Sequence, residues 1–143
     1  MSLRTELGRA FPELTEKGIF RFDEPLNEHC SFRIGGPAEA FCTPDSVTQI
    51  TNILGFAIDN NIQYFILGCG SNLLISDKGI SGLVIQTKGL NRISHDEDCV
   101  SAWCGAKLKD LCDYARDQGL AGLEFAAGIP GSVGGAVYMN AGA

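Results

Sequence analysis

The sequence contains no run of apolar residues long enough to cross a membrane. Its longest apolar runs, such as 64–67 and 82–85, have the length of a strand, whereas a membrane-spanning helix needs about 20 apolar residues. Charged side chains also recur through residues 1–20, so the uninterrupted apolar stretch of a secretory signal is missing. We therefore expect a cytoplasmic protein that has no membrane partner.

Basic residues are too few and too scattered for a nucleic-acid-binding surface. The chain has 11 Lys and Arg against 17 Asp and Glu, which gives a net charge of -6. No stretch gathers basic side chains into a patch that could neutralise successive phosphates. We expect no nucleic-acid partner.

Patterns typical of disulfide frameworks and metal sites are also missing. Six cysteines are present in 143 residues, but none forms a CxxC pair, and Cys99 and Cys104 have no histidine at metal-ligand spacing. Without a secretory signal, reduced thiols are expected. No metal site is predicted.

Along the chain, short apolar segments typical of strands alternate with segments that have a helical pattern. This order is typical of an α+β domain or of two small lobes. Strands are predicted at 19–22, 31–34, 38–42, 64–67, 81–87 and 100–103. The pattern at 3–14 indicates a short or broken helix, because Gly8 and Pro12 interrupt it. Within the polar stretch 94–98, residues 96–98 are interpreted as a solvated turn.

Two further helices are predicted with their ends. Thr43 and Pro44 suit the cap and first position of one helix, and its buried stripe would consist of Val47, Ile50, Leu54, Ala57 and Ile58. The other helix spans 107–118 and ends at Gly119, a residue suited to a left-handed cap. Residues 120–143 show no period and are interpreted as glycine-rich loop.

A glycine loop, Gly68-Cys69-Gly70-Ser71-Asn72, directly follows the strand at 64–67. Its small residues expose backbone N–H groups and let a diphosphate approach closely, and Ser71 and Asn72 add side-chain donors. The loop lacks the third glycine of the Rossmann fingerprint and the lysine of a Walker loop. A tight turn that ends a strand explains the glycines equally well, so both interpretations stay open.

Two more segments have unusual composition. Residues 126–136, AAGIPGSVGGA, are almost free of side-chain bulk. Because flexible linkers are richer in polar residues, this composition favours a loop that lines a ligand. In the second segment, 31–38, Arg33 is placed to meet an anion, although a plain β-turn with a solvated Arg33 is equally consistent.

Together, the segments SFRIGGPA, LGCGSNLLISDKGISGLVI and GLEFAAGIPGSVGGAVYMNAGA resemble the UDP-N-acetylenolpyruvoylglucosamine reductase family over about residues 19–143. The resemblance implies an α+β FAD-binding fold of the vanillyl-alcohol oxidase and p-cresol methylhydroxylase type. It implies two small lobes, 1–89 and 90–143, of which the second is incomplete. The substrate-binding lobe and the family's catalytic Arg, Ser or Cys, and Glu would lie beyond Ala143, so the chain alone is expected to be inactive.

The resemblance also implies a noncovalent FAD, whose diphosphate contacts the first glycine loop and whose flavin and ribityl chain contact the later segment. The implied cofactor-binding residues are Gly68, Cys69, Gly70, Ser71, Asn72, Leu73, Leu74, Ala127, Gly128, Ile129, Pro130, Gly131, Ser132, Gly134, Gly135 and Ala136. NADPH would reduce the flavin, which would reduce UDP-N-acetylglucosamine enolpyruvate to UDP-N-acetylmuramate for peptidoglycan synthesis, and hence for cell shape and division.

Two alternative functions remain open. One is an FAD-binding subunit of an oxidase or molybdenum hydroxylase, and the other is a noncatalytic nucleotide-binding module. Two cysteines depart from the family pattern: Cys69 replaces the usual Asn or Gly, and Cys30 replaces a common Thr. We interpret Cys69 as a small buried residue rather than a covalent flavin attachment. His29 and His95 are interpreted as solvated surface groups, and Cys112 as part of the core.

Overall fold

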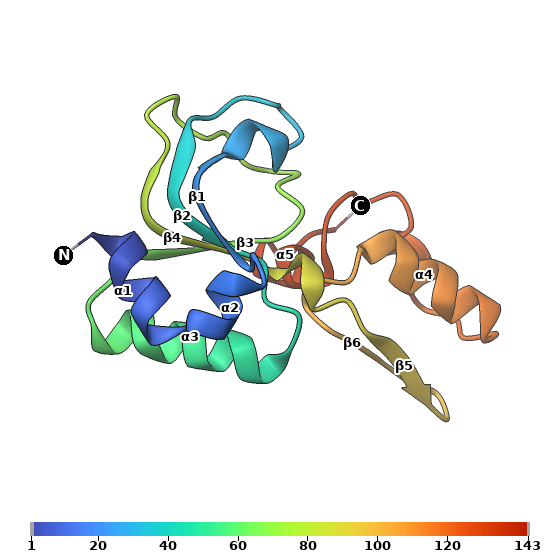
Figure 1. The fold of residues 1–143 in the computed structure, drawn as a ribbon. Helices are drawn as coiled ribbons and strands as arrows, with labels where there is room; N and C mark the ends of the chain where they lie inside the picture. The colour runs from blue at the N-terminus through green and yellow to red at the C-terminus, as the bar shows by residue number, and fades with distance from the viewer. Residues whose placement is uncertain (1, 143) are drawn as a thin grey trace.

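A four-stranded sheet and a separate two-stranded sheet organise the chain, of which the computed structural model describes residues 2–142 (Figure 1). The larger sheet has the strand order β1-β2-β4-β3. Its strands are β1 (Phe20–Pro25), β2 (Pro37–Cys42), β3 (Tyr64–Leu67) and β4 (Ile80–Gln86). β1 is antiparallel to β2, whereas β2, β4 and β3 are parallel. The carboxyl ends of these three strands therefore lie at one edge of the sheet.

Three helices cover one face of the larger sheet: α1 (Leu3–Ala10), α2 (Pro12–Glu16) and α3 (Val47–Asp59). Leu7 from α1 and Ile53 from α3 are fully buried in one core with Leu83 of β4. These apolar contacts hold the helices on the sheet, because burying side chains of this size is worth about 2 kcal/mol each.

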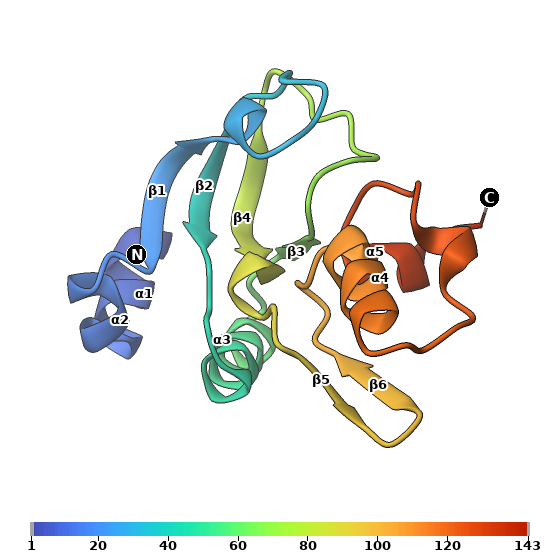
Figure 2. The ribbon, with the colours of Figure 1, turned by 90° about the vertical axis from the view of Figure 1, so that its right-hand side faces the viewer.

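The opposite face of the sheet is covered by irregular chain. The short helix η1 (Leu26–Glu28) and the long connection between β3 and β4 lie over this face (Figure 2). Leu26 and Ile75 from these segments pack against Phe41 and Val84 of the sheet. The connection that begins at Gly68 is thereby anchored to the sheet by its own apolar residues.

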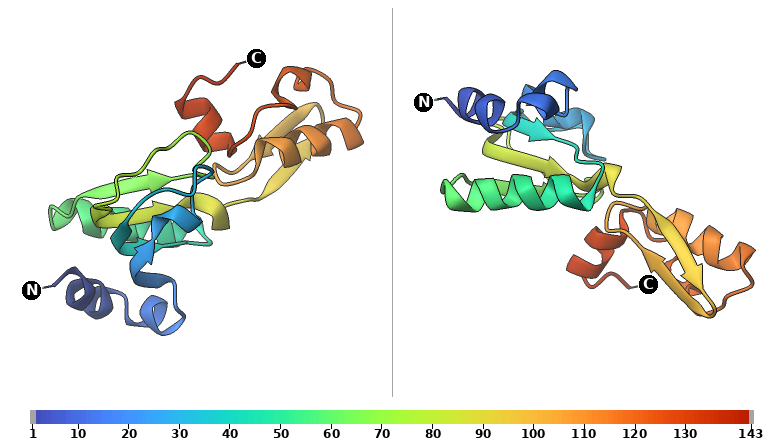
Figure 3. Two further views of the ribbon diagram at one scale, coloured as in Figure 1. Left: turned by 90° about the horizontal axis from the view of Figure 1, so that it is seen from above. Right: turned by 60° about the horizontal axis from the view of Figure 1, so that its bottom comes forward.

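A second group of elements follows the short helix η2 (Thr87–Gly89). It consists of a hairpin of β5 (Ile93–Asp96) and β6 (Cys99–Ala102), then α4 (Leu108–Asp117), η3 (Glu124–Ala126) and α5 (Val133–Tyr138). A small core of its own contains Leu108, Leu111 and Ala126. The hairpin extends away from the larger sheet (Figure 3).

Several predicted elements are confirmed. The strands at 38–42, 64–67, 81–87 and 100–103 and the helix at 107–118 are present to within one or two residues. The N-terminal helix is broken before Pro12 as expected, and Gly119 has the predicted left-handed conformation, with φ +72.

Two predictions in the first half are wrong. Residues 31–34 form a turn instead of a strand, because Arg33 has φ 55 and donates its backbone N–H to Cys30 at 3.2 Å. Thr43 does not cap α3: Ser46 does, accepting a hydrogen bond from the backbone of Gln49 at 3.3 Å. The helix therefore starts three residues late, and Val47 and Ile58 are exposed instead of buried.

Two elements in the second half were not predicted. Residues 93–96, for which no strand was predicted, form β5, in which Asp96 pairs with Cys99. The turn predicted at 96–98 lies at the tip of the hairpin, at 97–98. Within the predicted loop 120–143, η3 and α5 form, and Ser132 caps α5 through the backbone N–H of Gly135 at 3.2 Å. In the part of the chain that the structure describes, no helix has the length and apolar character needed to cross a membrane.

Candidate functional site

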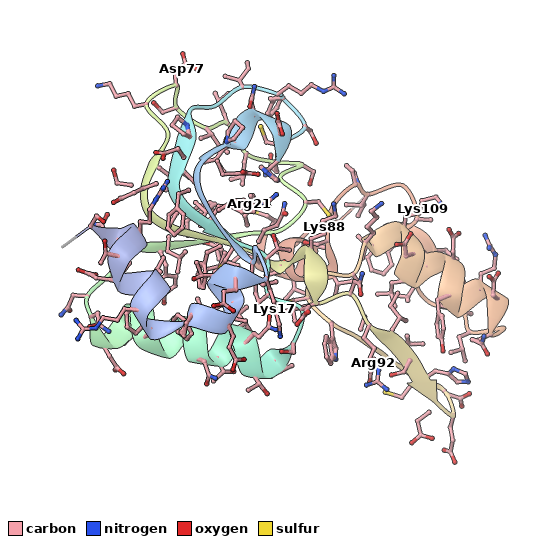
Figure 4. The ribbon with its side chains drawn as sticks, in the orientation of Figure 1. Lys17, Arg21, Asp77, Lys88, Arg92 and Lys109 are labelled. Atoms are coloured by element: carbon pink, nitrogen blue, oxygen red, sulfur yellow. The ribbon has the colours of Figure 1, made fainter. Side chains whose placement is uncertain are left out.

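A cleft of about 740 Å³ lies at the carboxyl ends of β3 and β4, where the larger sheet meets the second group of elements. Its lining comes from three places: the turn after η1, the ends of the two parallel strands, and the start of α4. Figure 4 shows Lys88 at this junction. Ligands of open α/β sheets bind outside the carboxyl ends of the strands, so the cleft is the candidate site.

The glycine loop after β3, whose first residues Gly68 and Cys69 line the cleft, has backbone donors without a partner. Within residues 2–142, no backbone N–H group from Cys69 to Leu74 donates a hydrogen bond. Gly70 has φ +67 and its carbonyl accepts from Ser31 at 3.0 Å, which fixes the turn. Successive N–H groups around a residue of positive φ form the concave nests that bind anions.

The structure brings the two predicted glycine segments together. The hydroxyl of Ser71 donates to the carbonyl of Pro130 at 3.4 Å. A side chain at Gly68 would clash with the hydroxyl of Ser132. The loop after β3 therefore packs directly on residues 130–132, with no room for a Cβ at its first position.

Ser132 connects this contact to α5. It is 2% exposed, and its hydroxyl accepts the hydrogen bond that caps the helix. The next two N–H groups, of Val133 and Gly134, donate to the carbonyls of Ala106 and Cys104, both at 2.8 Å. The backbone N–H groups of Val133 and Gly134 are therefore used within the chain and fix this segment in place. The N–H groups of the loop after β3, in contrast, are free.

Not all of the predicted site residues meet at the cleft. Of the sixteen, Gly68 and Cys69 line it. Leu73 packs into the core under the sheet, and Leu74 is 75% exposed. Ile129 and Ala136 pack against the core of the second group. The remaining residues lie in the two contacting segments, or, as with the exposed Ala127 and Gly128, face solvent beside them.

The cleft also contains residues that the sequence interpretation missed. Lys88, Lys107 and Asp110 line it together with Gln86. Lys88 follows a predicted strand and Lys107 opens a predicted helix, but the parallel order of β3 and β4, which was not predicted, is what brings both to the same edge. Arg33, expected to meet an anion, also lines the cleft.

His29 and Cys69 differ from their predictions. The side chain of His29 is 14% exposed, its Nε2 lies 2.7 Å from Glu24, and its ring centroid lies 4.4 Å from that of Phe41. It is therefore packed and partnered instead of solvated. Cys69 is exposed rather than buried. Partial desolvation in the cleft raises the pKa of the Cys69 thiol, and nearby Lys107 and Lys88 lower it by less.

The FAD binding domain family matches residues 38–143, well over half of the chain. The chain belongs to the FAD binding domain family. The prediction of FAD as cofactor is thereby confirmed. This FAD binding domain is 52% identical over 121 residues to UDP-N-acetylenolpyruvoylglucosamine reductase of Clostridium perfringens, a match covering 85% of this chain and 40% of that protein. The chain thus spans less than half the length of this relative.

Solved structures agree with the family match. The UDP-N-acetylenolpyruvylglucosamine reductase of Thermus caldophilus is 32% identical with a TM-score of 0.67, covering 87% of this chain and 42% of that one. p-Cresol methylhydroxylase shares the fold with a TM-score of 0.55 at 16% identity, covering 82% of this chain and 25% of that one. The predicted α+β fold type of this FAD binding domain is confirmed.

The residues at the cleft fit the diphosphate of FAD. Gly68 and Cys69 allow close approach, Lys88 and Lys107 provide positive charge, and the loop that begins there has free N–H donors, which are the three requirements of a phosphate group. Among the described residues, no group of three or more His, Cys, Asp or Glu is placed to hold a metal ion. The site therefore offers features suited to an anion, beside a segment of small residues.

Proposed function

We propose that this FAD binding domain serves a cytoplasmic, NADPH-dependent reductase that converts UDP-N-acetylglucosamine enolpyruvate to UDP-N-acetylmuramate in peptidoglycan synthesis, and thereby contributes to cell shape and division. The observation that carries the proposal is the loop 69–74, which follows the carboxyl end of β3 and has free backbone N–H groups. Ser71 in this loop contacts Pro130 of the second glycine segment. The 52% identity to the clostridial reductase supports this reaction over the oxidase alternative.

Each segment has its own proposed role. Backbone N–H groups of Cys69 to Leu74 hold the cofactor diphosphate, and the side chains of Ser71 and Asn72 add donors. Residues 127–132 and 134–136 line the flavin and ribityl chain, with small side chains that allow flat contact. The lobes 1–89 and 90–143 close on the cofactor from two sides and exclude water from it.

When bound, FAD supplies the hydride transfer from NADPH to the enolpyruvyl substrate. The role of this chain is to bind and orient FAD. Because the N–H groups of the loop are fixed by the contact between Gly70 and Ser31, they are organised before the ligand arrives. This saves the ordering entropy that a mobile loop would lose on binding.

Cofactor binding is tested by adding FAD to the purified chain, removing the excess by gel filtration and recording the visible absorption spectrum. We expect the chain to retain one oxidised flavin, and an acid precipitation step should release it, because attachment is noncovalent. A chain that emerges colourless would contradict the cofactor part of the proposal.

The reductase assignment is tested separately with a chimera. In it, this chain replaces the matching segment of the C. perfringens reductase. We expect the chimera to oxidise NADPH only when the enolpyruvyl substrate is present. A chimera that retains FAD but shows no substrate-dependent NADPH oxidation would contradict the assignment while leaving FAD binding intact.

A further inference from the structure

Two lysines flank the cleft from different parts of the chain. Lys88 lies in η2, directly after β4, and Lys107 immediately precedes α4. Both side chains are exposed, and both line the cleft with Cys69 (Figure 4 shows Lys88). One lysine thus belongs to the end of the larger sheet and the other to the second group of elements.

Both lysines are without an ion-pair partner in residues 2–142, whereas Lys109, on the exposed side of α4, pairs with Asp113. Unpaired cations at the wall of a cleft keep their full attraction for an anionic ligand, because no carboxylate has to be displaced first. Their arrangement is that of a binding site rather than of a structural salt bridge.

Charged side chains of both signs line the cleft around Cys69. Glu28 and Asp110 also line the cleft and oppose the lysines. However, Lys107 and Lys88 each affect the pKa of the Cys69 thiol more strongly than Asp110 does. In the lining of the cleft, Arg33, Lys88 and Lys107 also outnumber the two carboxylates.

We infer that Lys88 and Lys107 form a cation pair that neutralises a diphosphate seated on the backbone N–H groups of Cys69 to Leu74. This inference rests on the proposed function, because it takes the diphosphate of FAD as the ligand. Each phosphate of such a group carries one negative charge, which the two ammonium groups balance. Since the lysines belong to different groups of elements, the ligand also joins those groups electrostatically.

The experiment compares FAD affinity, by equilibrium dialysis, among the wild-type chain, Lys88→Met, Lys107→Met and the double variant. We expect each single variant to bind FAD about fivefold more weakly, as for a solvent-exposed charge pair. Added salt should weaken the wild type more than the double variant, because it screens the lysines. Lys88→Arg and Lys107→Arg should keep near wild-type affinity, because they keep the charge.

Lys78→Met is the matched control. Lys78 lies in the turn before β4, beside Asp77, which Figure 4 shows at the end of the sheet away from α3. Its replacement should leave FAD affinity and its salt dependence unchanged. Circular dichroism melts of all variants check that the fold is retained.

Unchanged FAD affinity in both methionine variants would overturn the inference, as would a loss of affinity that the arginine variants share. In either case the wild-type chain still binds FAD, and the proposed function stands. A wild-type chain that fails to bind FAD would instead contradict the proposed function itself, so the two failures are distinguishable.

Discussion

At the scale of single residues, Gly70 has no room for a side chain. Its φ is +67, and a Cβ there would run into the carbonyl oxygen of His29. Gly70→Ala should therefore lower the free energy of unfolding by about 3 kcal/mol and weaken FAD binding. Urea unfolding followed by circular dichroism measures the first effect, and flavin retention on gel filtration the second.

Gly8 provides the contrasting control. It lies inside α1, and a Cβ built there meets no atom within 4 Å. Gly8→Ala should raise the free energy of unfolding by roughly 0.5–1 kcal/mol, because alanine has the higher helix propensity. If both alanine variants were equally stable, the close approach of Gly70 to His29 would not hold in solution.

Cys69 gives a chemical readout of the cleft. Desolvation raises the pKa of its thiol, so little thiolate is present at neutral pH and alkylation by iodoacetamide should be slow. The rate should rise with pH through a midpoint above that of an ordinary thiol. Lys88→Met or Lys107→Met should move this midpoint further upward, because each removes a charge that favours the thiolate. Peptide mass spectrometry follows the labelling.

Buried Cys42 is the internal reference for that experiment. Burial raises its pKa to about 12, and it should remain unlabelled until the chain is unfolded. FAD should protect Cys69 and leave the exposed Cys99 unaffected. Equal labelling of Cys69 with and without FAD would place the cofactor outside the cleft.

Sequence reasoning at this scale found the glycine segments but not the lysines. Gly68 and Ser132 belong to short motifs whose composition is visible in the chain itself. Lys88 and Lys107 carry no motif, and their relation depends on the parallel order of β3 and β4 and on where α4 begins. His29 was interpreted as solvated because Glu24 and Phe41, its partners, come from β1 and β2.

At the scale of elements, two residues are candidates for the N-terminal cap of α3, Ser46 and Thr43. Ser46→Ala should lower the free energy of unfolding by about 1 kcal/mol, because it removes the acceptor for the Gln49 N–H group. Thr43→Ala should cost much less, since its hydroxyl only accepts a bond from Arg21 at 3.5 Å. Chemical denaturation of the two variants makes the comparison, and the reverse order of stabilities would support Thr43 as the cap.

Helices and strands could be predicted where the apolar pattern was clear. The prediction failed where the local composition disfavoured the element that forms. β3, β4 and α4 have strong periods and were found. α5 contains Gly134 and Gly135, which disfavour a helix, and it forms because Ser132 caps it and neighbouring carbonyls accept its first N–H groups. β5 is mainly polar, and pairing with β6 rather than burial defines it.

At the scale of the whole molecule, FAD should stabilise both groups of elements at once. A ligand present at 100 times its dissociation constant adds about 2.7 kcal/mol, which corresponds to a rise in melting temperature of roughly 5–10 °C for a chain of this size. Differential scanning fluorimetry with and without FAD measures the shift. Two separate transitions, only one of which moves, would contradict a cofactor held between the two groups.

The strand order β1-β2-β4-β3 also sets the order of events during synthesis on the ribosome. β2 and β3 leave the ribosome before β4, yet they are never neighbours, and the space between them belongs to β4. Until Gln86 emerges, β2 can pair only with β1, and β3 has no partner at all. The sheet is therefore completed only when β4 takes its place between β2 and β3, and the contact of Ser71 with Pro130 forms later still, because Pro130 leaves the ribosome after β4.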